Sequence, residues 1–139
     1  MTALTYDEIK KIVKDNNRSK ILSDEFIICL AWKESGFKSS IKNEKSTATG
    51  LMQITRGVII DVNKNFKTSF AHSEMSEPEK NIQCGTYYLD LRIKWAKKEK
   101  AGIEGFGTGK GYADKLYKCE ECLKSDSNHW ADALYKVHK

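Results

Sequence analysis

The stretch that decides the fold is residues 78–99, Pro78-Glu-Lys-Asn-Ile-Gln-Cys-Gly-Thr-Tyr-Tyr-Leu-Asp-Leu-Arg-Ile-Lys-Trp-Ala-Lys-Lys-Glu99. We expect a helix here, opened by the capping box Ser76-Glu-Pro-Glu79 with its proline in the first turn. A helix that is apolar over most of its circumference lies in the middle of a fold. Two apolar stripes at helical spacing predict this position: Ile82, Thr86, Leu89, Ile93 and Ala96, and beside them Cys84, Tyr88, Leu91 and Trp95.

On both sides of this helix, apolar residues recur at helical spacing along nearly the whole chain. The capping box Thr5-Tyr-Asp-Glu8 predicts a helix over about 6–16, and Ser23 caps a second helix that ends near Ser35-Gly36. Residues 36–54 indicate a polar loop with at most a small β element. The remaining helices are expected over 55–64, from Tyr112 after a Gly-rich stretch at 102–111, and around Trp130, Leu134 and Val137. The prediction is an all-α fold with little or no β structure, in a single compact domain over residues 1–139.

Composition excludes several classes of protein. The chain has 139 residues, a length that is enough for one domain with its own core. Of these residues 40% are apolar and 31% charged, and this apolar fraction is too high for a disordered chain. No apolar run approaches the roughly 18 residues that are needed to cross a membrane. Residues 1–20 lack the apolar segment of a Sec-type signal peptide. The net charge of +5 is scattered, and no nucleic-acid-binding module is recognisable. We therefore predict no signal peptide, no membrane insertion and no nucleic-acid partner.

Four cysteines leave two kinds of chemistry to weigh. A lone Cys119-x-x-Cys122 is a weak zinc signal because a closed site needs four ligands, which His129 and His138 would have to complete at an unusual spacing. Disulfides would form outside the cytoplasm, but the sequence leaves the pairing of these two cysteines with Cys29 and Cys84 open. We predict no metal and no cofactor.

Glu34 is a carboxylate on the inward-facing side of the second helix. It lies one and two turns after Leu30 and Ile27, so it shares their packing face. Partial desolvation disfavours the charged form and raises the pKa, which suits a general acid near neutral pH. Taken alone, a Glu at a helix end is more often a salt bridge, here with Lys33 or Lys38.

Three blocks of sequence place Glu34 in a wider pattern. Glu34-Ser35 is followed by Ser46-Thr-Ala-Thr-Gly-Leu-Met-Gln-Ile-Thr55, and then by Asn81-Ile-Gln-Cys-Gly85 with Tyr88-Leu89. In order and spacing, over residues 21–123, these blocks resemble the soluble lytic transglycosylase domain of the lysozyme-like superfamily. The resemblance implies a helical fold with a substrate cleft. It also implies cleavage of the β-1,4 bond between N-acetylmuramic acid and N-acetylglucosamine in peptidoglycan, giving 1,6-anhydromuramic ends.

The resemblance also implies roles for individual residues. Glu34 matches the single catalytic acid, which then acts as a base. In the central helix we expect Ile82 in the core and the amides of Asn81 and Gln83 to tie the helix to the cleft. The implied substrate-binding residues in the loop before that helix are Ser46, Thr47, Met52 and Gln53, and for Met52 a packing role in the core is the alternative.

The chain departs from the family in one element and carries one further carboxylate to consider. The Tyr-Asn-x-Gly element, whose tyrosine contacts the catalytic Glu, is replaced by the segment from Gly105 to Tyr112. We predict that Tyr112 supplies this contact, with Tyr87 as the alternative, and place both among the substrate-binding residues. Glu44 stands near the position at which goose-type lysozymes carry an acidic residue, so it is a candidate second carboxylate, although a solvated charge is the simpler interpretation.

The alternatives to an anhydro-forming enzyme are a hydrolytic muramidase and a non-catalytic cell-wall-binding module. We expect a monomer that acts on glycan strands at the cell wall or in the periplasm. A phage endolysin released through a holin and an antibacterial effector delivered by a secretion system both fit this expectation. The effector would also have a cognate immunity or inhibitor protein as a partner.

Overall fold

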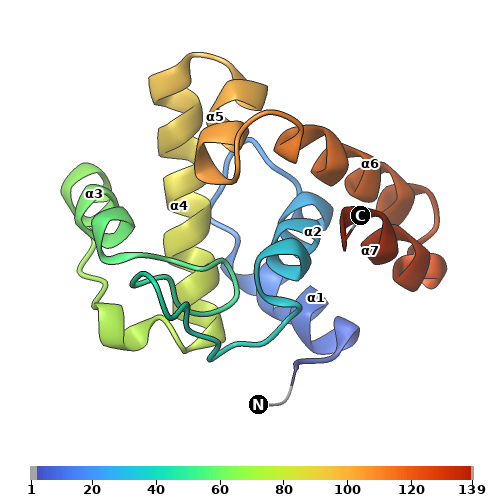
Figure 1. Cartoon of the computed structure of the whole chain (residues 1–139), viewed down its shortest axis with the longest axis horizontal. Coiled ribbons are helices and arrows are strands. Elements are labelled where there is room, and N and C mark those ends of the chain that lie inside the picture. Colours follow the sequence, from blue (N-terminus) through green and yellow to red (C-terminus); the bar gives the residue numbers. More distant parts are fainter. Residues whose placement is uncertain (1–2, 139) are drawn as a thin grey trace.

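Seven α-helices follow one another in residues 3–138, the part of the chain that this computed structural model describes, with the backbone alone for Ser127 and 136–138 (Figure 1). Between them lie short 3-10 turns and loops, and the loop at 36–54 holds only isolated β-bridges. The predicted all-α fold is confirmed. The helices are α1 (Tyr6–Asn16), α2 (Asp24–Ser35), α3 (Arg56–Phe66), α4 (Pro78–Ala96), α5 (Glu99–Phe106), α6 (Tyr112–Ser125) and α7 (Trp130–His138).

The boundaries of the first two helices are those that their caps predict. The Thr5 side chain accepts from the N–H of Glu8, and the Glu8 side chain accepts from the N–H of Thr5, which completes the capping box of α1. The Ser23 hydroxyl accepts from the N–H of Phe26 at the start of α2. Gly36 ends α2 in the left-handed conformation, with φ at 60°, so Glu34 lies in the last turn.

The central helix differs from its prediction in its N-terminal cap and in its C-terminal end. Pro78 does open α4, but the predicted capping box is wrong: the N-cap is Glu77, which makes no side-chain cap. The helix stops at Ala96 because Lys97 adopts a left-handed conformation with φ at 61°, and the chain turns into α5. The Gly-rich stretch is therefore partly helical. A Cβ added at Gly102 would lie 2.5 Å from the Cα of Ile93, so only glycine allows α5 this close to α4.

The core forms around α4, on which α1, α3 and α5 pack, while α2 packs on α6 and α7 (Figure 1). Most of the two predicted apolar stripes is buried. Trp95 is the exception, because 48% of its surface is exposed. Val137 in the last helix lies outside the residues whose side chains are described.

A disulfide between Cys29 and Cys119 joins α2 to α6. Cys119 is therefore not half of a Cys-x-x-Cys metal pair, and no group of three His, Cys, Asp or Glu residues suited to a metal occurs within the described residues. Cys84 and Cys122 lie outside the disulfide. Burial raises the pKa of the Cys84 thiol to about 12, so it packs as a neutral side chain. Among the described helices, none combines the length and apolar character that a membrane span requires.

Candidate active site

A hydrogen bond between side chains far apart in the sequence forms the centre of the site. The Tyr112 hydroxyl donates to Oε2 of Glu34 at 2.6 Å. Glu34 is half-buried in the last turn of α2, and Tyr112, which is only 2% exposed, is the first residue of α6. The predicted contact is present, and Tyr112 makes it.

The surroundings of Glu34 alter its acidity in two opposing directions. Burial raises the pKa of the Glu34 carboxyl above its ordinary value and is the largest influence on it. The hydrogen bond from Tyr112 and the positive charge of Lys33 lower the pKa and offset part of this rise. Burial and the neighbouring carboxylate also raise the pKa of Tyr112, so its hydroxyl keeps its proton and acts as the donor. Glu34 consequently holds its proton to a higher pH than an exposed Glu, as a general acid must.

The loop between α5 and α6 sets the position of Tyr112. A Cβ added at Gly107 would lie 2.3 Å from carbons of the Tyr112 ring, so the backbone of this loop lies directly against the ring. Glu104 holds the loop closed: its carbonyl accepts from the N–H of Gly109 at 3.1 Å, and its carboxylate accepts from the N–H of Gly111 at 3.0 Å. Neither Glu104 nor Gly107 was predicted as a site residue, and the excess of glycine was the only sequence signal of this tight turn.

Asn81 connects α4 to the motif loop, which we define as residues 46–55. Its Oδ1 accepts from the N–H of Met52, and its Nδ2 donates to the carbonyls of Thr49 and Met75, each at 2.8 Å. Gly50 is required beside it, because its φ is 80° and a Cβ there would lie 2.2 Å from the Met75 carbonyl oxygen. The expectation that Asn81 ties the helix to the loop is confirmed.

The two motif residues predicted to line the cleft lie in different surroundings. Gln53 is half-buried in the left-handed region, with φ at 54°, and its Nε2 donates to the carbonyls of Ile41 and Gly50 at 3.2 and 3.0 Å. No bond to its Oε1 is made within the described residues. Met52 is fully buried, and its Sδ would lie 2.4 Å from a Cβ at Gly85. Its side chain therefore packs between the motif loop and α4, and the prediction that it contacts a sugar directly is wrong.

The hydroxyls that precede the motif take part in local bonds. The Ser46 hydroxyl accepts from the N–H of Ala48 at 3.1 Å, and the Thr47 hydroxyl accepts from the N–H of Arg56 at 2.9 Å. Both residues are exposed. Glu44 is also exposed, and no hydrogen bond or ion pair joins it to another described side chain. This is the environment of a solvated charge.

Two residues of α4 that were predicted at the cleft contact other parts of the fold. The Tyr87 ring packs against Phe66 and Phe70, with ring centroids 4.6 and 6.4 Å apart, on the α3 side of the helix. Gln83 donates to Oδ1 of Asn16 at 2.8 Å and therefore ties α4 to α1, not to the cleft as predicted. Ile82 is in the core, as expected.

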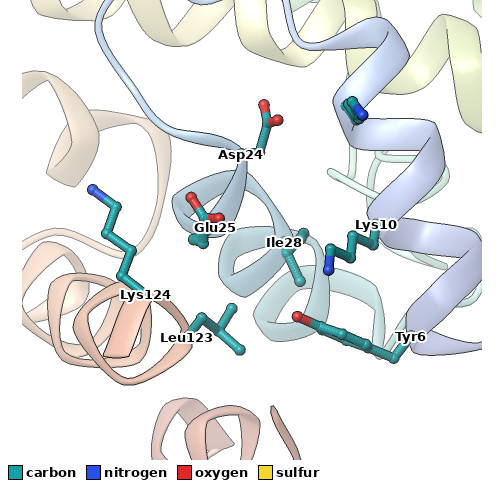
Figure 2. Close-up of a pocket in the computed structure, with 8 residues that line it drawn as sticks. Tyr6, Lys10, Asp24, Glu25, Ile28, Leu123 and Lys124 are labelled. Carbon is teal, nitrogen blue, oxygen red and sulfur yellow. The ribbon is translucent and has the colours of Figure 1, made fainter. Parts of the chain in front are cut away.

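A separate hollow lies at the opposite end of α2 from Glu34, among α1, α2 and α6 (Figure 2). It mixes acidic and basic side chains and contains none of the predicted site residues. Its lining is Tyr6, Lys10, Lys14, Asp24, Glu25, Ile28, Leu123 and Lys124.

Comparisons with known proteins agree with this geometry. The transglycosylase SLT domain matches residues 11–118. The fold is similar to a 70-kDa soluble lytic transglycosylase in complex with bulgecin A, with a TM-score of 0.63 and 22% identity over 96% of this chain and 21% of that one. It is also similar to the 70-kDa soluble lytic transglycosylase of Escherichia coli, with a TM-score of 0.61 and 19% identity over 96% of this chain and 23% of that one.

The chain thus spans about a fifth of the length of these two enzymes. No curated protein sequence matches it. The family match covers most of the chain, including Glu34, the motif loop, α4 and Tyr112. The chain belongs to the transglycosylase SLT domain family.

Proposed function

We propose that this protein is a peptidoglycan lytic transglycosylase that cleaves the β-1,4 bond between N-acetylmuramic acid and N-acetylglucosamine. The observation that carries the proposal is the half-buried Glu34 with its 2.6 Å hydrogen bond from Tyr112, in a chain of this family. A carboxyl with a raised pKa is the acid that such a cleavage needs.

In the proposed reaction, Glu34 acts twice. The protonated carboxyl first gives its proton to the glycosidic oxygen, and the bond from this oxygen to C1 of the muramic residue breaks. The N-acetyl oxygen of the same sugar stabilises the positive charge at C1. The Glu34 carboxylate then takes the proton of the muramic C6 hydroxyl, whose oxygen bonds to C1 and closes the 1,6-anhydro ring. One carboxylate is sufficient because the substrate supplies both nucleophiles, unlike the two-carboxylate scheme of most glycosidases.

Tyr112→Phe is expected to lower the rate on purified sacculi by about 10- to 100-fold, the effect of losing one hydrogen bond to a charged group. The pH profile carries a second signature. The Tyr112 hydrogen bond lowers the pKa of Glu34, so its loss should move the fall in activity at alkaline pH to a higher pH. Tyr87→Phe is the matched control, because the Tyr87 ring packs against α3 and is expected to leave rate and pH profile nearly unchanged. Equal effects of both changes would contradict the role of Tyr112.

The alternative of a hydrolytic muramidase depends on a second carboxylate, for which Glu44 is the candidate. Its exposure argues for a peripheral position. Glu44→Gln is therefore expected to change turnover less than roughly tenfold and to leave the anhydro product intact. Turnover on sacculi and the masses of the products measure both. A loss of turnover as large as that of Glu34→Gln would favour hydrolysis.

The biological role that we propose is bacteriolysis by a monomer at the cell wall or in the periplasm, after release as an endolysin or delivery as an effector with a cognate immunity protein. The Cys29–Cys119 disulfide supports work in an oxidising compartment. Expression in a bacterium with an added export signal is expected to lyse the cells, whereas the same level of protein without the signal should not. Culture density measures the difference. Equal lysis in both cases would contradict a periplasmic site of action.

A further inference from the structure

The face of α4 that contacts the motif loop extends along the helix past the residues that make this contact. Asn81, Gly85, Tyr88, Arg92 and Trp95 follow each other at alternating spacings of four and three residues, so they share this face. The first two contact the motif loop. The last three lie further along the helix, toward the end where α5 packs on α4 (Figure 1). Nothing in the proposed reaction uses them.

This part of α4 is connected directly to the active site. The Phe106 ring lies 5.9 Å from the Tyr88 ring, centroid to centroid. The next residue, Gly107, lies against the ring of Tyr112, whose hydroxyl binds Glu34. Two adjacent residues of this loop, Phe106 and Gly107, therefore contact Tyr88 on one side and Tyr112 on the other.

Arg92 has donors that the described part of the protein does not satisfy. Its Nε is buried and donates to none of the described residues. Among those residues, no carboxylate forms an ion pair with its guanidinium. Gly105 provides the room for this group, because a Cβ there would lie 1.8 Å from Nη2 of Arg92. An unsatisfied buried donor in a native protein calls for a partner, and the planar guanidinium fork matches a carboxylate.

Trp95 gives the same face an exposed aromatic surface. The apolar stripes predict that it is buried, yet 48% of it is exposed, and it meets Tyr88 edge to face at a centroid distance of 6.4 Å. Binding sites for organic ligands combine aromatic walls with a few placed polar groups. Aromatic surfaces of this kind suit the apolar C–H face of a pyranose ring. Arg92, which lies between Tyr88 and Trp95 in the sequence, adds a positive charge to this face.

We propose that Tyr88, Arg92 and Trp95 form a binding subsite for an acidic muramyl residue of the glycan. Tyr88 and Trp95 pack against the sugar, and Arg92 binds a carboxylate, either of the attached peptide or of the lactyl group once the peptide is removed. This inference rests on the proposed function, because it names the part of the substrate that is held beside the cleavage site.

Binding is measured by calorimetry in the Glu34→Gln background, so that no ligand is cleaved. The ligands are soluble glycan fragments with peptides, the same fragments stripped by an amidase, and uncharged chitotetraose. Arg92→Gln is expected to weaken binding of at least one of the two acidic ligands, the peptide-bearing or the stripped fragments, by roughly 10- to 100-fold, and of chitotetraose by less than about threefold. Trp95→Ala should weaken all three ligands. Lys94→Gln, which removes the same charge from an exposed position on another face of α4, is the matched control and should change nothing.

The stripped fragments distinguish the two sources of the carboxylate. In the intact fragments the lactyl carboxyl is an amide, so a loss of affinity of these fragments on Arg92→Gln assigns the partner to a peptide carboxylate. A loss confined to the stripped fragments assigns it to the free lactyl carboxylate. Arg92→Lys keeps the charge and the fold and should recover only part of the affinity. Equal affinity of Arg92→Gln and the parent for every ligand would overturn the subsite while leaving the lytic activity of the unmodified protein unaffected. Absence of lytic activity with Arg92-dependent binding would overturn the proposed function alone.

Discussion

Glu34→Gln is expected to lower the rate of lysis of purified sacculi by at least about 10²–10⁴-fold. The amide has the size of the carboxyl and can still accept a hydrogen bond from Tyr112. It cannot give a proton to the glycosidic oxygen or take one from the C6 hydroxyl, so both proposed steps fail. Loss of turbidity of a sacculus suspension measures the rate.

The same variant should remain folded. Burial raises the pKa of Glu34, which means that the folded state favours the neutral side chain, and Gln is neutral at every pH. The stability advantage of the protonated carboxyl is present at low pH and is lost as the pH rises through the raised pKa. Glu34→Gln should therefore be as stable as the unmodified protein in acid and slightly more stable at alkaline pH. Near-normal lysis by this folded variant would rule out Glu34 as the catalytic acid.

Reduction of the Cys29–Cys119 disulfide is expected to lower the free energy of unfolding by about 3–5 kcal/mol. The two cysteines are 90 residues apart in sequence, so the bond closes a long loop and restricts the unfolded chain strongly. It also joins α2, which carries Glu34, to α6, which carries Tyr112. Urea unfolding with and without a thiol reductant measures the difference.

Cys122→Ser is the control for this prediction, because Cys122 lies on the same helix as Cys119 but outside the disulfide. This variant should keep both the stability of the oxidised protein and its sensitivity to the reductant. Cys29→Ser should be insensitive to the reductant. Identical unfolding midpoints of the unmodified protein in oxidising and reducing buffer would contradict a stabilising role of the bond.

Local signals in the sequence predicted most of the fold. Thr5 and Ser23 are N-cap residues with bonds to the next turn, and Gly36 ends α2, so the boundaries of α1 and α2 depend on residues a few positions apart. The apolar stripes of α4 likewise predict its central position. The end of α4 was missed because Lys97 in a left-handed conformation has no sequence signature of the kind that glycine provides.

The site was less predictable because its geometry depends on distant contacts. The glutamate and its tyrosine partner were both identified, but through the family pattern. Burial of Met52 depends on the absence of a side chain at Gly85, and the direction of Gln83 depends on Asn16 in α1. The spacing of apolar residues also predicted that Trp95 is buried. This spacing identifies the apolar face of a helix, but it does not show whether another element covers that face.

The most direct test of the account is the mass of the products released from purified sacculi. Soluble fragments are separated and weighed by mass spectrometry, with Glu34→Gln as the inactive control and a hydrolytic muramidase as the reference. We predict muramic ends that are lighter by one water than the reference products, because the C6 hydroxyl closes the ring in place of water. Products with the masses of the hydrolytic reference would contradict this prediction.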